Sequence, residues 1–330
     1  MNIAVVILNW NGRLLLEQFL PSVITHSKEA VIYVADNAST DTSVTYIKDK
    51  FPEVRIIINT SNGGYAKGYN DALSQIEADI FCLLNSDVEV SKDWLIPIIK
   101  TFKSDSAVAA VQPKILDYKN KGYFEYAGAA GGFIDKMGYP YCRGRIFDTL
   151  EEDKGQYNDC IEIFWASGAC LFIKKQVFEE VGRLDEDFFA HQEEIDLCWR
   201  IHHLGYKVMY CGLSKVYHLG GATLDTMNPR KTFLNFRNNL FMLLKNVPGP
   251  KVWWVLFNRM LLDGLAGIKF LISGKFSHFA AILRAHFGFY LNFNRFVKKR
   301  KKLSQRGKYY SIFSVVWQYF ILKRKHFNQL

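Results

Sequence analysis

The sequence predicts an α/β protein with a mostly parallel sheet. Apolar segments alternate with helix-like segments along residues 1–90, and the apolar segments are rich in β-branched residues on both faces. Strands of this kind are typical of a parallel sheet that helices cover on both sides. Each apolar segment also ends in, or is soon followed by, Asn or Asp, so polar side chains are expected along one edge of the sheet.

The elements follow in a regular order. The predicted strands are "IAVVILNW" (3–10), "AVIYVADN" (30–37), "RIIINT" (55–60) and "DIFCLLNSD" (79–87). The helix-like segments between them are "GRLLLEQFLPSVITH" (12–26), "STDTSVTYIKDKF" (39–51) and "GGYAKGYNDALSQI" (63–76). Ser39 or Thr40 is well placed to cap the second helix. The chain is therefore expected to begin as β-α-β-α-β-α-β.

Composition excludes several classes of protein. Hydrophobic residues make up 49% and aromatic residues 15% of the chain, which excludes overall disorder. The six cysteines show no metal-binding or redox spacing, so we expect reduced core thiols and a reducing compartment. The N-terminal "MNIAVVILNW" lacks the features of a signal peptide and is expected to form a buried strand.

The charge is unevenly distributed. The net charge is +10, but no Asp or Glu occurs after Asp263, whereas 14 of the 42 basic residues lie there. The preceding chain thus carries 28 basic against 32 acidic residues, a net charge of −4. The sequence therefore predicts an acidic body and a basic, aromatic C-terminal region.

Polar side chains gather where the predicted strands end. In parallel sheets, ligands bind at the carboxyl ends of the strands. The residues at these exits are Asn9, Asn11, Asp36, Asn37, Asn62, Gly63, Gly64, Asn85 and Asp87. A dinucleotide-dependent dehydrogenase is disfavoured, because the first turn, "LNWNGRL", holds one glycine and no GxGxxG motif.

The fourth strand ends in the triplet "NSD", residues 85–87. A carboxylate here can hold a divalent metal that bridges the diphosphate of a nucleotide sugar. The alternative is that Asp87 only caps the following turn. A second acidic segment, "LDEDFFAHQEEIDLCWRIHHLGY", places Glu193, Glu194 and Asp196 at the start of a helix that ends at Gly205. Asp196 can pair with Arg200, and one of the three acids could remove a proton from a sugar hydroxyl.

Seven segments, taken in order, resemble the successive motifs of family 2 glycosyltransferases, most of all the bacterial rhamnosyltransferase-like branch. They are "VVILNWNG", "VADNASTD", "NTSNGGYAKGYNDAL", "LLNSDVEV", "WASGACLFIKK", "EEIDLCWRIHHLGY" and "VYHLGG". The resemblance covers residues 1–245 and implies a GT-A fold, which is a Rossmann-like, mostly parallel sheet flanked by helices. It also implies a divalent metal, Mg²⁺ or Mn²⁺, and transfer of a sugar with inversion.

The resemblance assigns roles to individual residues on the donor side. Asp36 would contact the nucleobase, and Asn9 would line the same pocket. The residues implied to lie close to the nucleotide are Asn62, Gly64, Lys67 and Asn70. Asp87 matches the acid of the metal motif, and Asn85 stands at its first position, where many relatives have Asp. An amide oxygen can still coordinate a cation.

Further roles concern catalysis and the acceptor. Glu194 matches the usual base, but relatives commonly have Glu-Asp where this chain has Glu193 and Glu194, so either glutamate could be the base. Asp196 is expected to be structural. His218 matches a histidine that completes the metal shell in some relatives. The segment corresponding to an acceptor-side loop contains Trp165, Ser167 and Gly168, although Trp165 could equally belong to the core.

Residues 246–330 form a predicted helical, basic extension. Its apolar stretches are interrupted by charge or are shorter than the roughly 20 residues that a spanning helix needs, so no transmembrane helix is predicted. Aromatic segments with Lys and Arg fit helices that lie on an anionic membrane surface, to which the cluster "RFVKKRKKLSQRGK" (295–308) would be attracted. The alternative is a solvated basic linker. Nucleic acid is not expected, because no recognition motif accompanies the charge.

The expected function is that of an inverting glycosyltransferase in bacterial cell-surface glycan synthesis. The donor would be a dTDP- or UDP-linked sugar such as rhamnose, and the acceptor a glycan or lipid-linked hydroxyl. The enzyme would act as a peripheral protein on the cytoplasmic face of the cell membrane. The alternatives are a sugar nucleotidyltransferase and a catalytically silent, membrane-associated nucleotide-sugar-binding protein.

Overall fold

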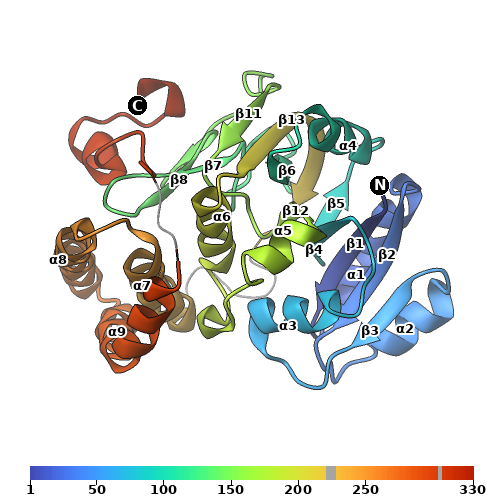
Figure 1. The fold of residues 1–330 in the computed structure, drawn as a ribbon, viewed down its shortest axis with the longest axis horizontal. Helices are drawn as coiled ribbons and strands as arrows, with labels where there is room; N and C mark the ends of the chain where they lie inside the picture. Colours follow the sequence, from blue (N-terminus) through green and yellow to red (C-terminus); the bar gives the residue numbers. More distant parts are fainter. Residues whose placement is uncertain (221–227, 304–306) are drawn as a thin grey trace.

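The computed structural model describes residues 1–220, 228–303 and 307–330, and its sheet lies between layers of helices (Figure 1). Gly221 of the "VYHLGG" segment and residues 304–306 of the basic cluster lie outside the described residues. The first elements are β1 (Ile3–Asn9), α1 (Arg13–His26), β2 (Ala30–Asp36), α2 (Ser43–Lys50), β3 (Arg55–Ile58), α3 (Gly64–Leu73), β4 (Ile80–Asn85), β5 (Val88–Val90), α4 (Leu95–Ser104) and β6 (Val108–Asp117).

The chain then forms short strands and the helices that follow them. These are β7 (Gly132–Ile134), β8 (Pro140–Cys142), β9 (Arg145–Ile146), β10 (Thr149–Leu150), β11 (Cys160–Ile163), β12 (Cys170–Lys174), α5 (Lys175–Glu180), the 3₁₀ turn η1 (Glu186–Phe188), α6 (Glu193–His203) and β13 (Lys207–His218). The C-terminal elements are α7 (Pro229–Asn246), α8 (Lys251–Ile272), α9 (Phe276–Lys301), and the short turns η2 (Trp317–Ile321) and η3 (Phe327–Gln329).

The predicted β-α-β-α-β-α-β start is confirmed. Strands β4, β1, β2 and β3 are adjacent and parallel, with Val6 of β1 opposite Tyr33 of β2 and Leu83 of β4. Both faces of β1 and β4 are buried, as their continuous apolar sequence requires. The carboxyl ends of these strands, with their Asn and Asp residues, therefore meet at one edge of the sheet.

The sheet becomes mixed beyond β4. Its order is β11-β13-β6-β12-β4-β1-β2-β3, in which β12 is antiparallel to β4 and β6, and β13 is parallel to β6. A small antiparallel sheet, β7 to β10, lies beside it. All six cysteines are free thiols, and only Cys160 is exposed.

The expected cap of the second helix is wrong. Helix α2 begins at Ser43, whose backbone N–H and hydroxyl both donate to Asp41 Oδ1, at 3.0 and 2.5 Å. Ser39 is used elsewhere, because its Oγ accepts from Asn11 N (2.9 Å) and Asn9 Nδ2 (3.2 Å). The serine that was expected to cap the helix instead joins the ends of β1 and β2.

The C-terminal helices pack against one another beside the sheet, at the left of Figure 1. The rings of Phe241 in α7 and Phe296 in α9 are stacked with centroids 3.8 Å apart. Arg300 of α9 donates to Leu244 O (3.0 Å) and Val247 O (2.6 Å) at the end of α7. The expected domain boundary after residue 245 thus falls in the last turn of α7, and α9 packs against this helix. Within the described residues, every helix is too short or too polar to cross a membrane.

A buried ion pair inside α8 allows a test of this packing. Asp263 is fully buried and accepts from Arg259 Nε at 2.8 Å, with His286 Nε2 3.2 Å away. Replacing Asp263 with Ala leaves the buried Arg259 charge without its carboxylate, so we expect the free energy of unfolding to fall by about 3–5 kcal/mol. Urea titration measures this loss.

The control is an exposed pair with the same spacing, Arg13 and Glu17 of α1, at 2.9 Å. Glu17→Ala should change the free energy of unfolding by about 0.5 kcal/mol or less, because solvent screens such pairs. Equal effects of the two substitutions would contradict the role of burial.

Candidate active site

The ends of β1 and β2 are joined by a buried polar cluster. Asn9 Nδ2 donates to Asp36 Oδ1 (3.1 Å), and Asp36 Oδ2 accepts from Ser39 N (2.9 Å). Asn9 Oδ1 is buried without a hydrogen-bond partner among the described residues. A Cβ on Gly12 would come within 2.5 Å of this oxygen, which explains the glycine in "NWNG". The two residues expected to face the nucleobase are therefore in direct contact.

A second set of amides continues this edge towards α3. Asn37 Nδ2 donates to Asn62 Oδ1 (2.9 Å), and Asn37 Oδ1 accepts from Asn59 Nδ2 (3.1 Å). Asn62 Oδ1 also accepts from Gly64 N at 3.0 Å, where α3 begins. Asn62 and Gly64, both expected near the nucleotide, are thus held together by Asn37.

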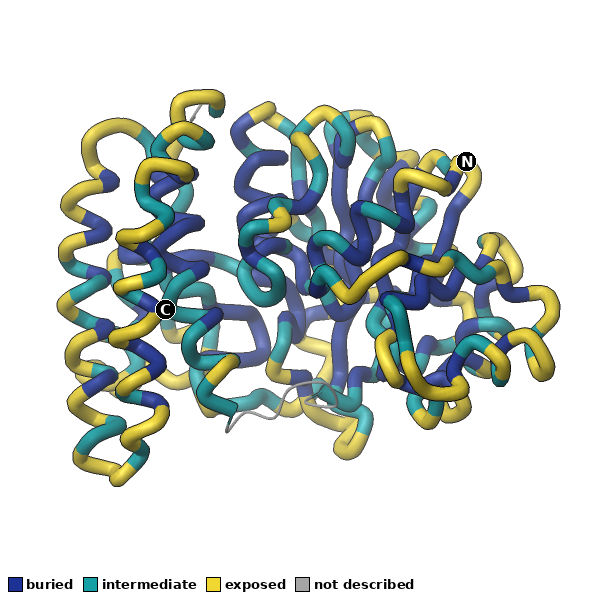
Figure 2. Tube along the Cα trace, turned by 90° about the horizontal axis from the view of Figure 1, so that it is seen from below, coloured by how far each residue is buried: buried dark blue, intermediate teal, exposed yellow. Residues whose placement is uncertain are grey.

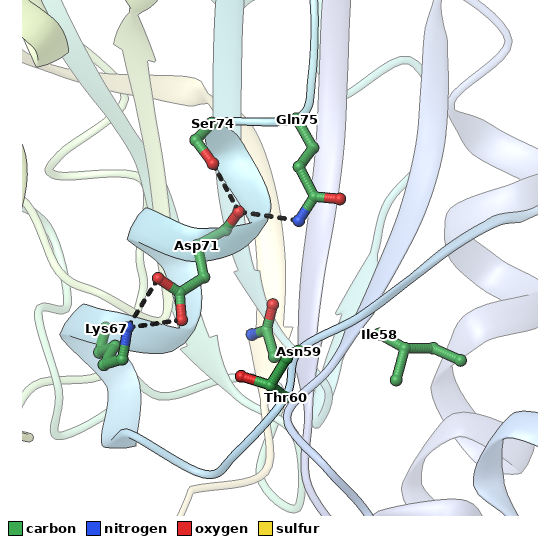
Figure 3. A pocket seen from close by; sticks show the side chains of 7 residues that line it. All are labelled: Ile58, Asn59, Thr60, Lys67, Asp71, Ser74 and Gln75. Atoms are coloured by element: carbon green, nitrogen blue, oxygen red, sulfur yellow. Dashed lines mark hydrogen bonds and ion pairs between the residues drawn. The ribbon is translucent and has the colours of Figure 1, made fainter.

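The other two expected donor residues of α3 make contacts of their own. Lys67 binds Asp71 at 2.8 Å and lines a pocket of about 330 Å³, drawn in Figure 3. The remaining lining residues are Ile58, Asn59, Thr60, Asp71, Ser74 and Gln75. Asn70 is buried, donates to Leu184 O (2.9 Å) and Glu186 Oε1 (3.1 Å), and accepts from Leu184 N. Asn70 therefore fastens α3 to the segment before α6.

Asn85, Asp87 and His218 lie together at the ends of β4 and β13. His218 Nε2 is 3.1 Å from Asp87 Oδ1 and 3.4 Å from Asn85 Nδ2. The register of β5 on β13, with Val88 opposite His218, brings these residues together although 131 positions separate Asp87 from His218. On the other side of the ring, Nδ1 is 3.4 Å from Glu125 Oε2.

This cluster favours a positive charge. Burial lowers the pKa of the His218 imidazole, but the carboxylates of Asp87 and Glu125 outweigh burial and raise that pKa to about 10. The described residues hold no group of three His, Cys, Asp or Glu side chains arranged as a metal site. A cation that took the place of the imidazole proton would meet a carboxylate, a neutral imidazole nitrogen and the amide of Asn85. This set suits Mn²⁺ or Mg²⁺ when phosphate oxygens supply the other ligands. Asp87, His218 and Asn85 thus fit a metal that is shared with a bound diphosphate.

Glu193 and Glu194 begin α6, as predicted. Each has one carboxylate oxygen that is buried without a hydrogen-bond partner among the described residues. Burial, and then the charge of Glu194, raises the pKa of Glu193 well above its usual range. Burial also raises the pKa of Glu194, to about 7, against backbone hydrogen bonds that lower it. Glu194 therefore has the pKa expected of a general base near neutral pH.

The α3 N-terminus lies against the loop that precedes these glutamates. Tyr65 N donates to Phe189 O at 2.8 Å, and a Cβ on Gly64 would come within 2.4 Å of the same oxygen. Gly64 has φ +82°, which an L side chain rarely adopts, so this position favours glycine on both counts. The segment expected near the nucleotide and the segment of the expected base are thus adjacent.

The three expected acceptor-side residues differ in their surroundings. Trp165 is buried and donates through Nε1 to Phe133 O at 2.8 Å, as a core residue would. Ser167 is buried too, and its hydroxyl donates to Ala127 O. Gly168 O accepts from the Tyr65 hydroxyl at 2.8 Å. Of the three, Gly168 is joined by a hydrogen bond to α3.

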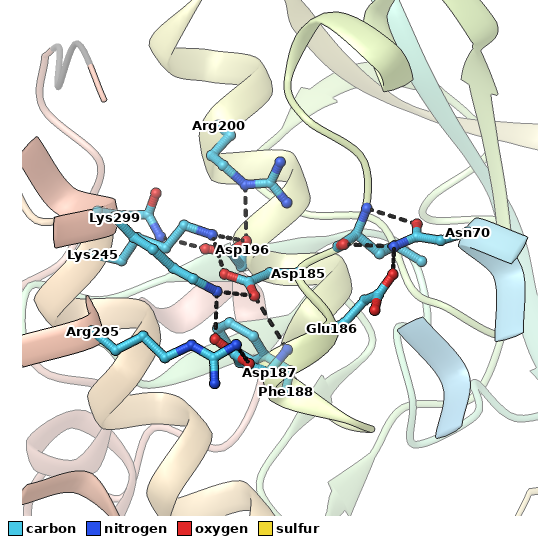
Figure 4. A network of polar contacts seen from close by, with 12 residues as sticks. Asn70, Asp185, Glu186, Asp187, Phe188, Asp196, Arg200, Lys245, Arg295 and Lys299 are labelled. Atoms are coloured by element: carbon cyan, nitrogen blue, oxygen red, sulfur yellow. Dashed lines mark hydrogen bonds and ion pairs between the residues drawn. The ribbon is translucent and has the colours of Figure 1, made fainter. Parts of the chain in front are cut away.

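A network of charges connects α6 to neighbouring elements (Figure 4). Asp196, predicted to be structural, accepts from Arg200 Nε (2.9 Å) and Lys245 Nζ (2.8 Å). Lys245 also binds Asp185 at 2.7 Å. Lys299 of α9 reaches Asp185 and Asp187 in turn. This network links η1, α6, α7 and α9 through buried or half-buried charges.

Sequence patterns missed several of these residues. Tyr65 lies inside the motif "NTSNGGYAKGYNDAL", but its side chain carries no charge and is not a typical metal ligand. Glu125 follows β6 in a segment without periodicity, and only the fold brings it to His218. Asn238 lies in α7 beyond the last quoted motif, yet it donates to three carbonyls of the loop before Glu193. No local sequence pattern predicts contacts of this kind.

Comparison with known proteins places these residues among glycosyltransferases. N-acetylglucosaminyl-diphospho-decaprenol L-rhamnosyltransferase of Mycobacterium tuberculosis is 24% identical over 219 residues, 62% of this chain and 71% of that protein. Among solved structures, GalNAc-T7 with UDP, GalNAc and Mn²⁺ is similar with a TM-score of 0.57 and 17% identity. The likeness covers 74% of this chain and about half (48%) of that chain.

A mannosyltransferase from Pyrobaculum calidifontis, in complex with GDP-Man and Mn²⁺, has a TM-score of 0.53 and 14% identity. The likeness covers 91% of this chain and 84% of that chain. These two likenesses confirm the GT-A fold.

The family itself follows from the sequence match. The model of glycosyl transferase family 2 matches residues 4–182, which is more than half of the chain and contains the strand ends from Asn9 to Asp87. The match agrees with the expectation from the motifs and decides against a sugar nucleotidyltransferase. The chain therefore belongs to glycosyl transferase family 2 and is a glycosyltransferase with the GT-A fold.

Proposed function

We propose that this enzyme transfers a sugar, with inversion, from a dTDP- or UDP-linked donor to a hydroxyl of a lipid-linked or polysaccharide acceptor. Bacterial cell-surface glycan synthesis at the cytoplasmic face of the membrane is the proposed setting, and rhamnose is the first sugar to test. The likeness to the M. tuberculosis rhamnosyltransferase supports rhamnose and a lipid-linked acceptor. One observation carries the proposal: a half-buried glutamate, with an oxygen that has no partner among the described residues, follows the loop whose Phe189 carbonyl accepts from Tyr65 N of α3. Helix α3 begins near the carboxyl edge of the sheet, where ligands bind in folds of this kind.

Glu194 is the proposed base. Its carboxylate takes the proton from the acceptor hydroxyl while that oxygen attacks the anomeric carbon, and the bond from this carbon to the diphosphate oxygen breaks. The nucleoside diphosphate leaves with the bonding electrons, and no covalent enzyme intermediate forms. Glu193 is more deeply buried and its pKa is raised further, so it is the weaker candidate at neutral pH.

Asp36 and Asn9 are proposed to bind the nucleobase, and the α3 segment the rest of the nucleotide. Asp87, His218 and Asn85 are proposed to hold Mg²⁺ or Mn²⁺. Such a cation, when bound, neutralises the charge that develops on the departing diphosphate. GalNAc-T7 was solved with Mn²⁺ and UDP, and the Pyrobaculum mannosyltransferase with Mn²⁺ and GDP-Man, which supports a metal of this kind here.

The C-terminal region, from residue 246 on, is proposed to contact an anionic membrane surface. Helix α8 exposes a continuous apolar stripe on its outer side, formed by Trp253, Trp254, Phe257, Leu261, Leu265, Ile268 and Ile272. Figure 2 shows exposed residues along the outer faces of the helices at its left edge. The single carboxylate in this stretch of α8, Asp263, is buried and paired, so no negative charge opposes lipid phosphates.

Only part of the basic cluster is available for lipid. Arg295 and Lys299 bind Asp187, and Arg300 binds backbone carbonyls. The exposed lysines of the cluster include Lys298, Lys301 and Lys302. The positive charge that faces outward is therefore smaller than the sequence indicates.

A thermal-shift screen of nucleotide sugars with and without Mn²⁺ or Mg²⁺ tests the function. We expect stabilisation by one dTDP- or UDP-linked sugar, larger with metal, and slow release of the nucleoside diphosphate from that donor. Binding without any release, in the presence of membrane lipid extract as acceptor source, would instead identify a catalytically silent protein.

Glu194→Gln should preserve donor binding and lower nucleoside diphosphate release by about 10²-fold or more, because the proton acceptor is gone. Since the base acts deprotonated and the pKa of Glu194 is about 7, kcat of the unaltered enzyme should rise with pH through this value and level off above it. The matched control is Glu193→Gln, expected to remain active with the same pH profile. A loss confined to Glu193→Gln would move the role one residue earlier.

Asp87→Ala should abolish the metal-dependent part of UDP binding, as measured by calorimetric titration with and without Mn²⁺. The carboxylate supplies the main negative charge next to His218, so the cation loses its principal ligand. Asp87→Asn keeps the shape of the side chain and should show the same loss of metal-dependent binding. Full Mn²⁺-dependent binding by both variants would refute the metal site.

Reversal of charge at Lys298, Lys301 and Lys302 to Glu should weaken binding to phosphatidylglycerol vesicles by about 10²-fold or more at low salt, since each nearby cation contributes about 1 kcal/mol. The difference should shrink at high salt, where exposed charges are screened. Reversal of three exposed lysines at the other end of the molecule, Lys28, Lys48 and Lys50, provides the control in a vesicle co-sedimentation assay. Equal effects of the two triple variants would exclude a specific membrane face.

A further inference from the structure

The loop before α6 has an unusual backbone conformation. Phe189, His191 and Gln192 have φ of 64°, 70° and 74°, although none is glycine. Residues other than glycine rarely adopt this conformation, and it persists only where the surroundings hold it in place. Glu193 and Glu194 follow directly, so the conformation of this loop sets where the two carboxylates lie.

One side chain of α7 binds this loop at three points. Asn238 is fully buried, and its Nδ2 lies 2.8 Å from Phe188 O, 2.9 Å from Ala190 O and 2.8 Å from His191 O. An amide has two N–H groups, so at least one is shared between two carbonyls. Three acceptors in a stretch of four residues thus converge on a single donor group.

Arg237 determines which way this amide points. Its Nε and Nη2 donate to Asn238 Oδ1 at 2.9 and 2.8 Å. Because the guanidinium only donates, the amide oxygen must face Arg237 and the amide nitrogen must face the loop. The Arg237 side chain also donates to Phe188 O at 3.3 Å.

The loop is held from the opposite side by α3. Phe189 O accepts from Tyr65 N at 2.8 Å, so Phe189 lies between the segment expected at the nucleotide and the amide of α7. Asn238 contacts the backbone of the loop and not the carboxylates, and it acts on the reaction only through their position.

We propose that Asn238 is a positioning residue that fixes the loop 188–192 and thereby aims Glu194 at the acceptor hydroxyl. The proposal rests on the proposed function of Glu194 as the base. A displacement of about 1 Å in a reacting group can lower a rate by about 10²-fold, so an indirect contact of this kind has a measurable effect.

The test uses a neighbour as a matched control. Asn239 is equally buried on the same helix, but its Nδ2 donates to Gly138 O (2.9 Å), away from the loop. Both Asn238→Ala and Asn239→Ala remove a buried amide, and both should lower the melting temperature. Only Asn238→Ala should lower kcat, by about 10-fold or more, with KM for the donor within about twofold and with a displaced pH midpoint of kcat. The assay is nucleoside diphosphate release from the donor that the thermal-shift screen selects.

Two further variants sharpen the result. Asn238→Asp keeps the shape but turns a carboxylate oxygen towards three carbonyls, so its kcat should fall further than that of Asn238→Ala. Arg237 is only half-buried, so Arg237→Ala should fold even if Asn238 variants do not, and it should lower kcat in the same direction by a smaller factor.

The outcomes distinguish a failure of the positioning role of Asn238 from a failure of the proposed base, Glu194. If Glu194→Gln is inactive while the Asn238 and Arg237 variants match Asn239→Ala in kcat and pH profile, the positioning role is refuted and the base remains. If Glu194→Gln is fully active, the proposed base is refuted, and the positioning role with it.

Discussion

The buried carboxylate of Asp196 holds helices α6 and α7 together at the end of the molecule that carries the proposed base. It accepts from Arg200 on its own helix and from Lys245 and Asn246 of α7, at 2.9, 2.8 and 2.7 Å. Charges of this kind are tolerated in the interior only when every one is compensated, and loss of one partner typically costs about 3–5 kcal/mol. Helices α6 and α7 are therefore bound to one relative position, and the glutamates at the start of α6 inherit that position.

The same network connects α7 and α9 to the segment from Asp185 to Asp196. Lys245 also binds Asp185, whose pKa is held below its usual range: burial opposes this shift, but Lys245 and Lys299 outweigh it. Lys299 comes from α9, the helix that carries the outward-facing lysines. The surface proposed to meet lipid and the helix that carries the proposed base are thus joined by one network of charges. Removal of α8 and α9 would therefore expose buried charge and apolar rings of α7.

Much of the fold could be predicted from the sequence. The four apolar runs became β4-β1-β2-β3, and the polar residues at their ends met, because a buried parallel strand can expose polar groups only where it leaves the sheet. The start of α6 at Glu193 was also predictable, since a cluster of acids suits a helix N-terminus. The cap of α2 was not predictable, because the Ser39 hydroxyl instead accepts from Asn9 Nδ2 at the end of β1.

The class of the protein follows from local sequence alone, because the period and polarity of its segments specify a parallel α/β sheet and the ordered motifs specify the family. The tertiary structure alone decided which side chains act together. Glu194 differs from Glu193 through burial and mutual charge, His218 meets Asp87 through the register of β5 on β13, and Asn238 reaches the loop from 47 or more positions away. A pKa and a hydrogen bond depend on neighbours in space, and these neighbours come from segments whose local sequence carries no record of the contact.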